Sequence, residues 1–211
     1  MFVEHIDLFR CPVGHEDSWL VAATRRTVGR RIVEGTLGCP VCRAEYGIAD
    51  GVAYFGVEPG AGEHAGETAE APEELAMRAA AFLSLSEAGG TVVLAGEWAP
   101  AGPALVELTR VGVVLVNPPA GLRIPDEGAS VVRFAGHLPV GAGLLRGAAV
   151  DATLPPEATV HALRARARLV APASAALPAE CTEIARDQRH WVAELNTTTS
   201  APVQLRLVRN P

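Results

Sequence analysis

The sequence predicts an α/β protein in which a small β-rich segment precedes a larger sheet of mainly parallel strands. Short apolar runs separated by turns fill residues 1–56, and a Gly-, Ala- and Glu-rich stretch without apolar periodicity fills residues 57–72. From residue 73 onward, strands that are apolar throughout alternate with helical patterns, which is typical of a parallel sheet buried on both faces. We therefore expect a β-rich module at 1–56, a flexible acidic linker at 57–72 and an α/β domain at 73–211.

The β-rich module is predicted to consist of short strands joined by tight turns. Asp50-Gly51 lies between two short apolar runs and is a strong hairpin signal. The expected strands are 18–22, 31–37, 44–48 and 52–55.

Two longer helices are predicted in the α/β domain. Pro72 with the acidic pair that follows it opens the first, because negative charge in the first turn suits the helix dipole, and Gly89-Gly90 ends it. Pro155-Pro156-Glu157 opens the second, which we expect to run to Arg168. Arg164, Arg166 and Arg168 are interpreted as solvated charges that complement the dipole at its end, with a partner-binding patch as the alternative. The other expected elements are a short helix at 103–110 and the strands 91–96, 111–117, 130–135, 145–152, 168–172, 182–186, 190–195 and 203–208, of which the last form an antiparallel hairpin.

Composition and charge narrow the classes of function. The 211 residues are 49% hydrophobic, so the chain can bury a sizeable core. Residues 57–90 carry 7 acids and 1 arginine, so the formal net charge of −6 comes entirely from this segment. Neither flank has the basic excess expected of a nucleic-acid binder. With no apolar run of signal or membrane-spanning length, we expect a cytoplasmic protein without membrane contact and with a protein as its partner class. The polar turn 186–191 is the best exposed candidate for that contact.

A pair of cysteine and histidine knuckles predicts a metal site. Cys39 and Cys42 form a CxxC knuckle, and Cys11 with His15 forms a CxxxH knuckle upstream. Zinc takes four such ligands at the corners of a tetrahedron, and turns rich in Pro and Gly let two ligands of one loop converge on one ion. Three thiolates and one imidazole make a closed structural site, which can stabilise a module too small for a large core.

Two other residues and two other interpretations compete with this assignment. His5 is a weaker rival to His15 because it lies outside both knuckles. Cys181 stands alone and is interpreted as a small buried apolar residue. The module could also fold without metal, or the CxxC knuckle could serve redox chemistry.

The segments FRCPVGH (9–15) and GTLGCPVCRAEYGIADGVAYF (35–55) resemble the zinc-ribbon family that includes the small activator subunit of tRNA and translation-factor methyltransferases. Residues 46–52 match the aromatic and Asp-Gly-Ile/Val part of the family pattern, with Gly47 where Pro is common. The first knuckle differs, because CxxxH replaces CxxC. The resemblance covers about residues 6–56 and implies a structural zinc ion. The same ribbon also occurs fused ahead of class I methyltransferase domains.

The segments FAGHLPVGAGLLRGAAVDATL (134–154) and VHALRARARLVAP (160–172) resemble class I S-adenosylmethionine-dependent methyltransferases. They look like the exit of strand three, the Leu-Pro turn and strand four, and then the helix and fifth strand. The resemblance covers residues 73–211 and implies a Rossmann-like sheet with a terminal antiparallel hairpin. The domain is reduced, since the segment 118–129 lacks the helix expected between strands two and three.

The Gly-rich turn that would hold the cofactor is altered in this chain. In the family, glycines after strand one let the backbone approach the ligand. Here Gly96 remains, while Trp98 and Pro100 stand where the next two glycines belong, and Glu97 adds negative charge near the ligand carboxylate. Trp98 either fills the space of the methionine moiety or packs against the end of the sheet, and we favour packing.

The other two cofactor positions are altered as well. The resemblance implies an acid for the ribose hydroxyls at the end of strand two, where this chain has Asn117, and an acid for the adenine after strand three, where it has Ala135, Gly136 and His137. Asp151 ends strand four and is interpreted as a strand-end cap, with a substrate-facing group as the alternative.

These observations predict a zinc-binding, methyltransferase-like protein that has lost S-adenosylmethionine binding and acts as a binding or accessory protein. The alternative is an active S-adenosylmethionine-dependent methyltransferase with an atypical cofactor turn, and a third class is another enzyme or nucleotide-binding protein on the same scaffold. The turn at 94–100 is the sequence feature that distinguishes them.

Overall fold

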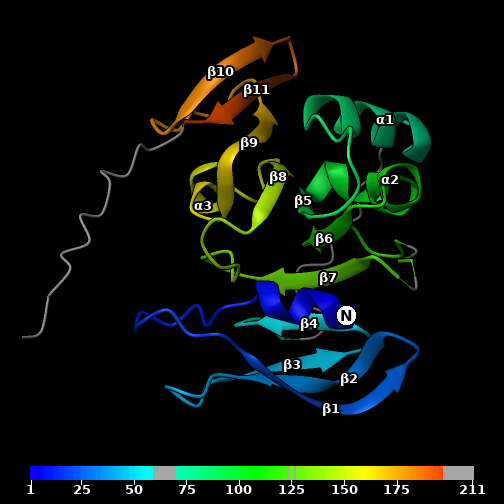
Figure 1. Ribbon diagram of the computed structural model, residues 1–211, viewed down its shortest axis with the longest axis vertical. Coiled ribbons are helices and arrows are strands. Elements are labelled where there is room, and N and C mark those ends of the chain that lie inside the picture. The colour runs from blue at the N-terminus through cyan, green and yellow to red at the C-terminus, as the bar shows by residue number, and fades with distance from the viewer. Residues whose placement is uncertain (59–69, 123, 126, 197–211) are drawn as a thin grey trace, which may run out of the picture.

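The computed structural model describes residues 1–58, 70–122, 124–125 and 127–196, in which one mixed sheet is accompanied by few helices (Figure 1). The sheet runs in the order β1-β2-β3-β4-β7-β6-β5-β8-β9-β11-β10. The strands are β1 (Val21–Val28), β2 (Arg31–Gly38), β3 (Glu45–Ala49), β4 (Val52–Phe55), β5 (Thr91–Ala95), β6 (Gly112–Val116), β7 (Ala129–Phe134), β8 (Leu145–Ala149), β9 (Leu163–Pro172), β10 (Cys181–Arg186) and β11 (His190–Leu195). The helical segments are η1 (Val3–Leu8), α1 (Pro72–Phe82), η2 (Gly96–Ala101), α2 (Gly102–Thr109) and α3 (Glu157–Val160). No helix in the described ranges is long and apolar enough to cross a membrane.

The centre of the sheet is parallel, as the apolar strands predict. β5 pairs in parallel with β6 on one side and with β8 on the other, β7 extends the parallel part beyond β6, and β9 extends it beyond β8. β11 is antiparallel to both β9 and β10. The antiparallel hairpin at the end of the sheet is therefore β10 with β11, and the expected strand 203–208 lies outside the described residues.

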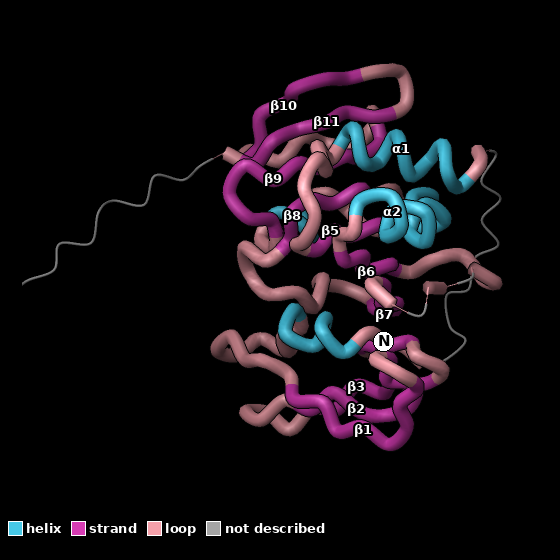
Figure 2. Tube along the Cα trace, turned by 45° about the vertical axis from the view of Figure 1, so that its right-hand side comes forward, coloured by secondary structure: helices cyan, strands magenta, loops and turns pink. Residues whose placement is uncertain are grey.

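Both faces of the parallel strands are buried, although the two longer helices, α1 and α2, cover only one of them. Alternate residues of β5 point to opposite sides, so that Val92 and Leu94 belong to one core cluster and Val93 and Ala95 to the other. The first cluster lies under α1 and α2, which run side by side over that face (Figure 2). The second cluster includes loop residues such as Phe9, Leu138, Val140 and Leu154, and the short helical segments η1 and α3 also pack against it.

Three predicted elements differ from the structure. The helix expected to end at Gly89-Gly90 is α1, which ends at Phe82. The helix expected to run from Glu157 to Arg168 is a single turn, α3, after which β9 begins at Leu163. Residues 163–169 alternate Leu or Ala with Arg, a period of two that suits a strand, and the arginines lie on the exposed side or in a bulge where Arg166 has φ 63°. The strand expected at 18–22 is β1, which starts later and is exposed along most of its length, so it has no apolar alternation to mark it.

The module at 1–56 does not stand apart from the α/β domain. β4 pairs in parallel with β7, so the strands of the module continue the central sheet. Phe55 of β4 and Phe134 of β7 lie opposite each other and share one core cluster. Without this pairing, β7 would expose a row of unpaired backbone groups. Most of the predicted linker, residues 59–69, lies outside the described residues, and the boundaries at 56 and 73 stay predictions.

Candidate functional site

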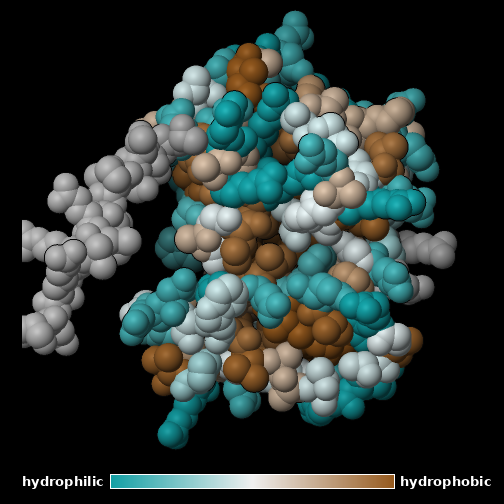
Figure 3. Space-filling model, viewed as in Figure 1, coloured by the Kyte–Doolittle hydropathy of each residue, from teal (hydrophilic) through white to brown (hydrophobic). Residues whose placement is uncertain are grey.

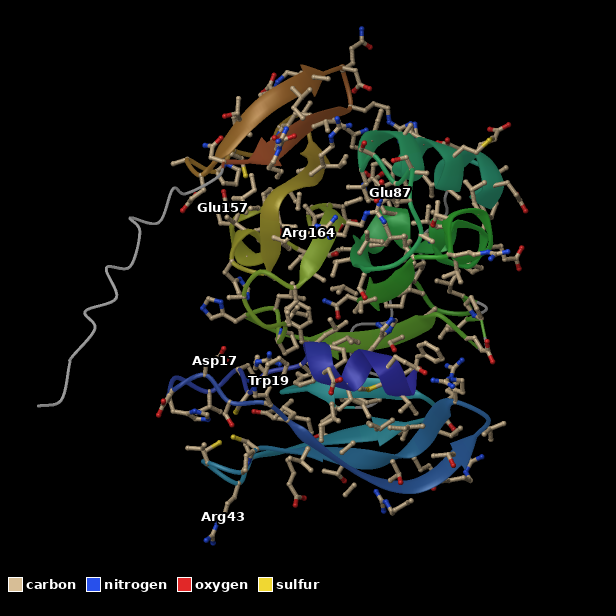
Figure 4. The ribbon with its side chains drawn as sticks, viewed as in Figure 1. Asp17, Trp19, Arg43, Glu87, Glu157 and Arg164 are labelled. Atoms are coloured by element: carbon tan, nitrogen blue, oxygen red, sulfur yellow. The ribbon has the colours of Figure 1, made fainter. Side chains whose placement is uncertain are left out.

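Tight turns bring the two predicted knuckles together at one end of the module. The first follows a short bridge in which Phe9 pairs with Val140, and the backbone N–H of Cys11 bonds to the carbonyl of Ser18 at 3.0 Å. The second lies between β2 and β3, where the N–H of Cys39 bonds to the carbonyl of Ala44 at 2.9 Å. Figure 4 labels Asp17, Trp19 and Arg43 around this end of the molecule.

The four predicted ligands lie within reach of one ion. The ligand atoms of Cys11, His15, Cys39 and Cys42 are all within 4.8 Å of one another. The sulfurs of Cys11 and Cys42 are 3.6 Å apart, and Cys39 Sγ is 3.4 Å from His15 Nε2. A tetrahedral zinc ion with Zn–S bonds of about 2.3 Å would place its sulfur ligands about 3.8 Å apart. The donor set and its spacing thus fit a metal ion, and a Cys/His cluster of this kind can bind one.

Hydrogen bonds prepare these groups for ligation. Burial raises the pKa of the Cys39 thiol, but hydrogen bonds from the backbone N–H groups of Cys42 and Val41 outweigh it and lower this pKa to about 6. The thiolate, which is the metal-binding form, is therefore favoured. His15 Nδ1 lies 2.6 Å from the carbonyl oxygen of Glu16, which can only accept, so Nδ1 carries the proton and Nε2 presents its lone pair to the sulfurs.

Tyr46 supports the cluster from β3. Its hydroxyl lies 3.3 Å from Cys11 Sγ, and its ring stacks on Phe55 with centroids 4.8 Å apart. Burial raises the pKa of Tyr46, with a further increase from the hydrogen bond to Cys11, so the hydroxyl stays protonated and can donate a hydrogen bond to the sulfur. Sequence analysis missed this role; the signal is an aromatic residue four positions after the CxxC knuckle.

The two other candidates, His5 and Cys181, lie away from the cluster. His5 is 3% exposed, its Nδ1 is 2.9 Å from Ser130 Oγ on β7, and burial lowers its pKa to about 4. It therefore fastens η1 to the parallel sheet as a neutral side chain. Cys181 is buried at the start of β10.

The predicted cofactor positions follow the carboxyl ends of β5, β6 and β7. β5 has β6 on one side and β8 on the other, which makes this edge the topological switch point where open α/β sheets bind their ligands. Gly96 starts η2 with φ 49°, and the Asp151 carboxylate lies directly against it: a Cβ on Gly96 would be 1.7 Å from Asp151 Oδ2. The same oxygen accepts the backbone N–H of Glu97 at 3.0 Å.

Asp151 is held in place by its own loop. Its second oxygen accepts hydrogen bonds from the N–H of Thr153 at 2.9 Å and from the Thr153 hydroxyl at 2.6 Å. This arrangement is a strand-end cap that reaches across to the glycine turn. These contacts of Asp151 are those of a strand-end cap. Its additional contact with the turn at 96–97 could not be predicted from the sequence.

Trp98 lies inside the core and has no exposed surface. Its ring packs against Phe82 at 6.2 Å and against His190 at 5.0 Å between centroids, and the Arg78 guanidinium lies over it at 5.5 Å. The indole N–H has no hydrogen-bond partner in the described part of the chain. Trp98 is thus a packing residue between α1 and the hairpin strand β11.

Glu97 makes an ion-pair contact across the sheet edge. Its carboxylate lies 3.1 Å from Nε2 of His190 and 3.9 Å from the Arg189 guanidinium. The hydrogen bond from His190 lowers the pKa of Glu97 from its ordinary value, against the effect of burial. No feature of the sequence links Glu97 to His190, because they lie on segments 93 residues apart.

Asn117 and His137, the remaining two positions, differ in their surroundings. Asn117 has φ 43°, its Oδ1 accepts the N–H of Phe134 at 3.1 Å, and its Nδ2 donates to the carbonyl of Phe134 at 3.2 Å. Both ends of the amide thus bind the backbone at the end of β7. His137 lies exposed in the following turn and does not join the other positions.

Comparisons with known proteins point to methyltransferases as structural neighbours. No family model and no curated protein matches the chain. A candidate sarcosine dimethylglycine methyltransferase from Galdieria sulphuraria aligns at 11% identity over 47% of this chain and 45% of its own length, with a TM-score of 0.37. The candidate methyltransferase yhhF from Escherichia coli aligns at 13% identity over 60% of this chain and 86% of its own, with a TM-score of 0.35. The chain thus spans less than half the length of the first of these, and at such TM-scores the likeness carries no argument about function.

Proposed function

We propose that this chain is a zinc-binding, methyltransferase-like protein that does not bind S-adenosylmethionine and acts as a binding or accessory protein. The strand order supports the methyltransferase-like part. Strands β7-β6-β5-β8-β9 follow the 3-2-1-4-5 order of nucleotide-binding α/β sheets, and the hairpin β10–β11 ends the sheet as the family resemblance implies.

The contact of Asp151 with Gly96 is the observation that carries the loss of cofactor binding. A glycine in this turn is useful because it lets a ligand approach the backbone, and here the protein's own carboxylate occupies that space. The same carboxylate takes the Glu97 N–H, and the amide of Asn117 is occupied by the backbone of Phe134. S-adenosylmethionine would have to break these contacts before making its own.

The energetic consequence follows from simple arithmetic. Losing one charged hydrogen-bond partner weakens binding by about 1.5–3 kcal/mol, and each 1.4 kcal/mol is roughly a tenfold change in the dissociation constant. The chain lacks a carboxylate for the adenine, offers an engaged amide for the ribose and places a carboxylate against the glycine turn. Together these changes move a micromolar site to about 1 mM or weaker.

The zinc ion has a structural role in this proposal. Three sulfurs and one imidazole would fill the four tetrahedral positions, which leaves no open position for a substrate. The ion would join the turns before β1 and after β2, and this module pairs with β7 through β4. Zinc would therefore stabilise the part of the molecule that protects the edge of the parallel strands.

Calorimetric titration with S-adenosylmethionine, and in parallel with S-adenosylhomocysteine, tests the proposed loss of binding. We expect no dissociation constant below about 1 mM for either ligand. A micromolar value would overturn the proposal and would favour an active methyltransferase with an atypical cofactor turn.

A further inference from the structure

The two helices on the covered face leave a groove between them. Each helix supplies three residues at the i, i+3, i+4 spacing of one helical face, and together they line a hollow of about 390 Å³. The lining residues are Glu73, Ala76 and Met77 of α1 with Ala104, Glu107 and Leu108 of α2. The hollow exists because small alanines form the floor while longer side chains rise on both sides.

The walls of this groove are apolar side chains that the other described residues leave largely uncovered. Met77 is 57% exposed and Leu108 is 55% exposed, although both lie on helices that already bury other residues against the sheet. Leu75 and Leu105 fill that inward role and are buried. In Figure 3, apolar surface lies among polar surface over the region of α1. The outward apolar pair is therefore not needed for packing in the chain as described.

The rim of the groove is acidic. Glu73 and Glu107 are exposed and form no ion pair among the residues that the structure describes, and the exposed Glu74 follows Glu73 on α1. Arg78, the only basic residue of α1, is paired with Glu70. The α1 side of the groove belongs to the segment 57–90, from which the whole net charge of the protein comes.

We propose that the groove binds a basic amphipathic helix of a partner protein, with an apolar stripe against Met77 and Leu108 and Arg or Lys side chains near Glu73 and Glu107. An apolar groove between helices is a common receptor for such a helix, and the acidic rim selects its charge. A flexible methionine suits a surface that adapts to its partner. This inference rests on the proposed binding function and names the chemistry of its partner.

Peptide titration against the full-length protein tests the proposal. The probe is a Leu/Lys peptide of about 18 residues with Leu at helical spacing, and its control is a peptide of the same composition with the Leu residues scattered. We expect the striped peptide to bind at least about tenfold more tightly, with chemical-shift changes at the Met77 methyl group and at Leu108. Equal binding of the two peptides would overturn the proposal.

Charge variants separate the groove from the general acidity of the protein. Glu73→Lys with Glu107→Lys should weaken binding of the striped peptide about tenfold or more. Glu157→Lys with Glu180→Lys makes the same change in net charge on exposed residues outside the groove, and Figure 4 shows Glu157 on the other side of the molecule from α1 and α2. This control pair should change affinity by less than about threefold. Equal losses in both pairs would overturn the proposal.

Two other occupants give distinct results. Concentration-dependent self-association that Met77→Ser with Leu108→Ser abolishes would assign the groove to a second copy of the chain. Tighter peptide binding by Arg206→Glu with Arg209→Glu would assign it to the chain's own C-terminal segment. Either result would overturn a partner protein as the occupant. Peptide binding and S-adenosylmethionine binding are separate measurements, so failure of one proposal is distinguishable from failure of the other.

Discussion

Asp151 and Asn117 occupy, with their own side chains, the edge at which an open α/β sheet would bind a ligand. Both point their polar atoms at the protein's own backbone, Asp151 at Glu97 and Asn117 at Phe134. From the sequence, Asn117 could be placed at the end of its strand, but its partner could not be foreseen. The backbone of Phe134 becomes a partner only because β6 and β7 lie side by side.

The amide of Asn117 gives a sharp prediction. Asn117→Asp replaces the Nδ2 donor with an oxygen that faces the carbonyl of Phe134, so two acceptors would meet without a proton. We expect a loss of about 1–3 kcal/mol in the free energy of unfolding, measured by urea denaturation. The matched control is Asn196→Asp, whose oxygen only accepts a hydrogen bond from Thr182 and should change stability by less than about 0.5 kcal/mol. An unchanged stability of the Asn117→Asp protein would show that the hydrogen bonds between Asn117 and Phe134 do not form.

The contact between Glu97 and His190 predicts a pH dependence. Because the folded-state pKa of Glu97 lies below its ordinary value of 4.5, unfolded chains bind more protons there, and the contribution of Glu97 is lost as the pH falls below that value. Glu97→Gln should therefore flatten the fall in stability on acidification below about pH 4.5. The measurement is the urea midpoint between neutral and acidic pH. Parallel pH profiles for the two proteins would show that the pair contributes nothing.

A substitution of Cys39 tests the proposed metal site. Cys39→Ser removes the buried thiol of the cluster, so we expect less than one zinc per chain and a loss of more than about 4 kcal/mol in stability. Elemental analysis and thermal unfolding measure the two effects. Cys181→Ser is the matched control, since that thiol lies outside the cluster, and it should keep its metal. Full zinc content in Cys39→Ser protein would exclude the proposed ligand set.

Among the elements, those with a strong local pattern were predicted best. The strand β4, the hairpin at Asp50-Gly51 and the parallel strands β5 to β8 were found within a few residues, because apolar runs and turn residues mark them. The segment 157–172 was predicted as a helix followed by a short strand, yet most of it is β9. Arginine and alanine favour helices locally, and the period of two became decisive only through pairing with β8 and β11. The pairing of β4 with β7 was not predicted, since it joins residues about 80 positions apart and leaves no local signal.

The pairing of β4 with β7 predicts that the module and the parallel sheet unfold together. Phe55→Ala removes a ring that packs on Tyr46 and Phe9, and we expect it to cost about 3–5 kcal/mol. Tyr54→Ala, on the half-buried side of the same strand, should cost only roughly 1 kcal/mol. In a Trp19→Phe background, fluorescence of Trp98 and Trp191 reports on the sheet and zinc release reports on the module, and both should follow one transition. Two separate transitions would show that the module folds independently of the sheet.

At the scale of the whole molecule, the structure is one continuous sheet whose two outer strands are protected from further pairing. β1 and β10 each contain a bulge in their register, and each carries charged residues on its exposed side, such as Arg26 and Glu183. These features hinder edge-to-edge association. The edges of the sheet are therefore poorly suited to pairing with another strand, and the surface that we propose for a partner is the groove between α1 and α2.

We propose that the folded protein carries a structural zinc ion and that the edge at the carboxyl end of β5 is closed to S-adenosylmethionine. Native mass spectrometry of the freshly purified chain tests both parts in a single measurement. We expect the mass of the polypeptide with one zinc ion and with no adduct of S-adenosylmethionine or S-adenosylhomocysteine, also after incubation with a micromolar excess of either. A folded chain without zinc, or a species that retains one of these ligands, would contradict this proposal.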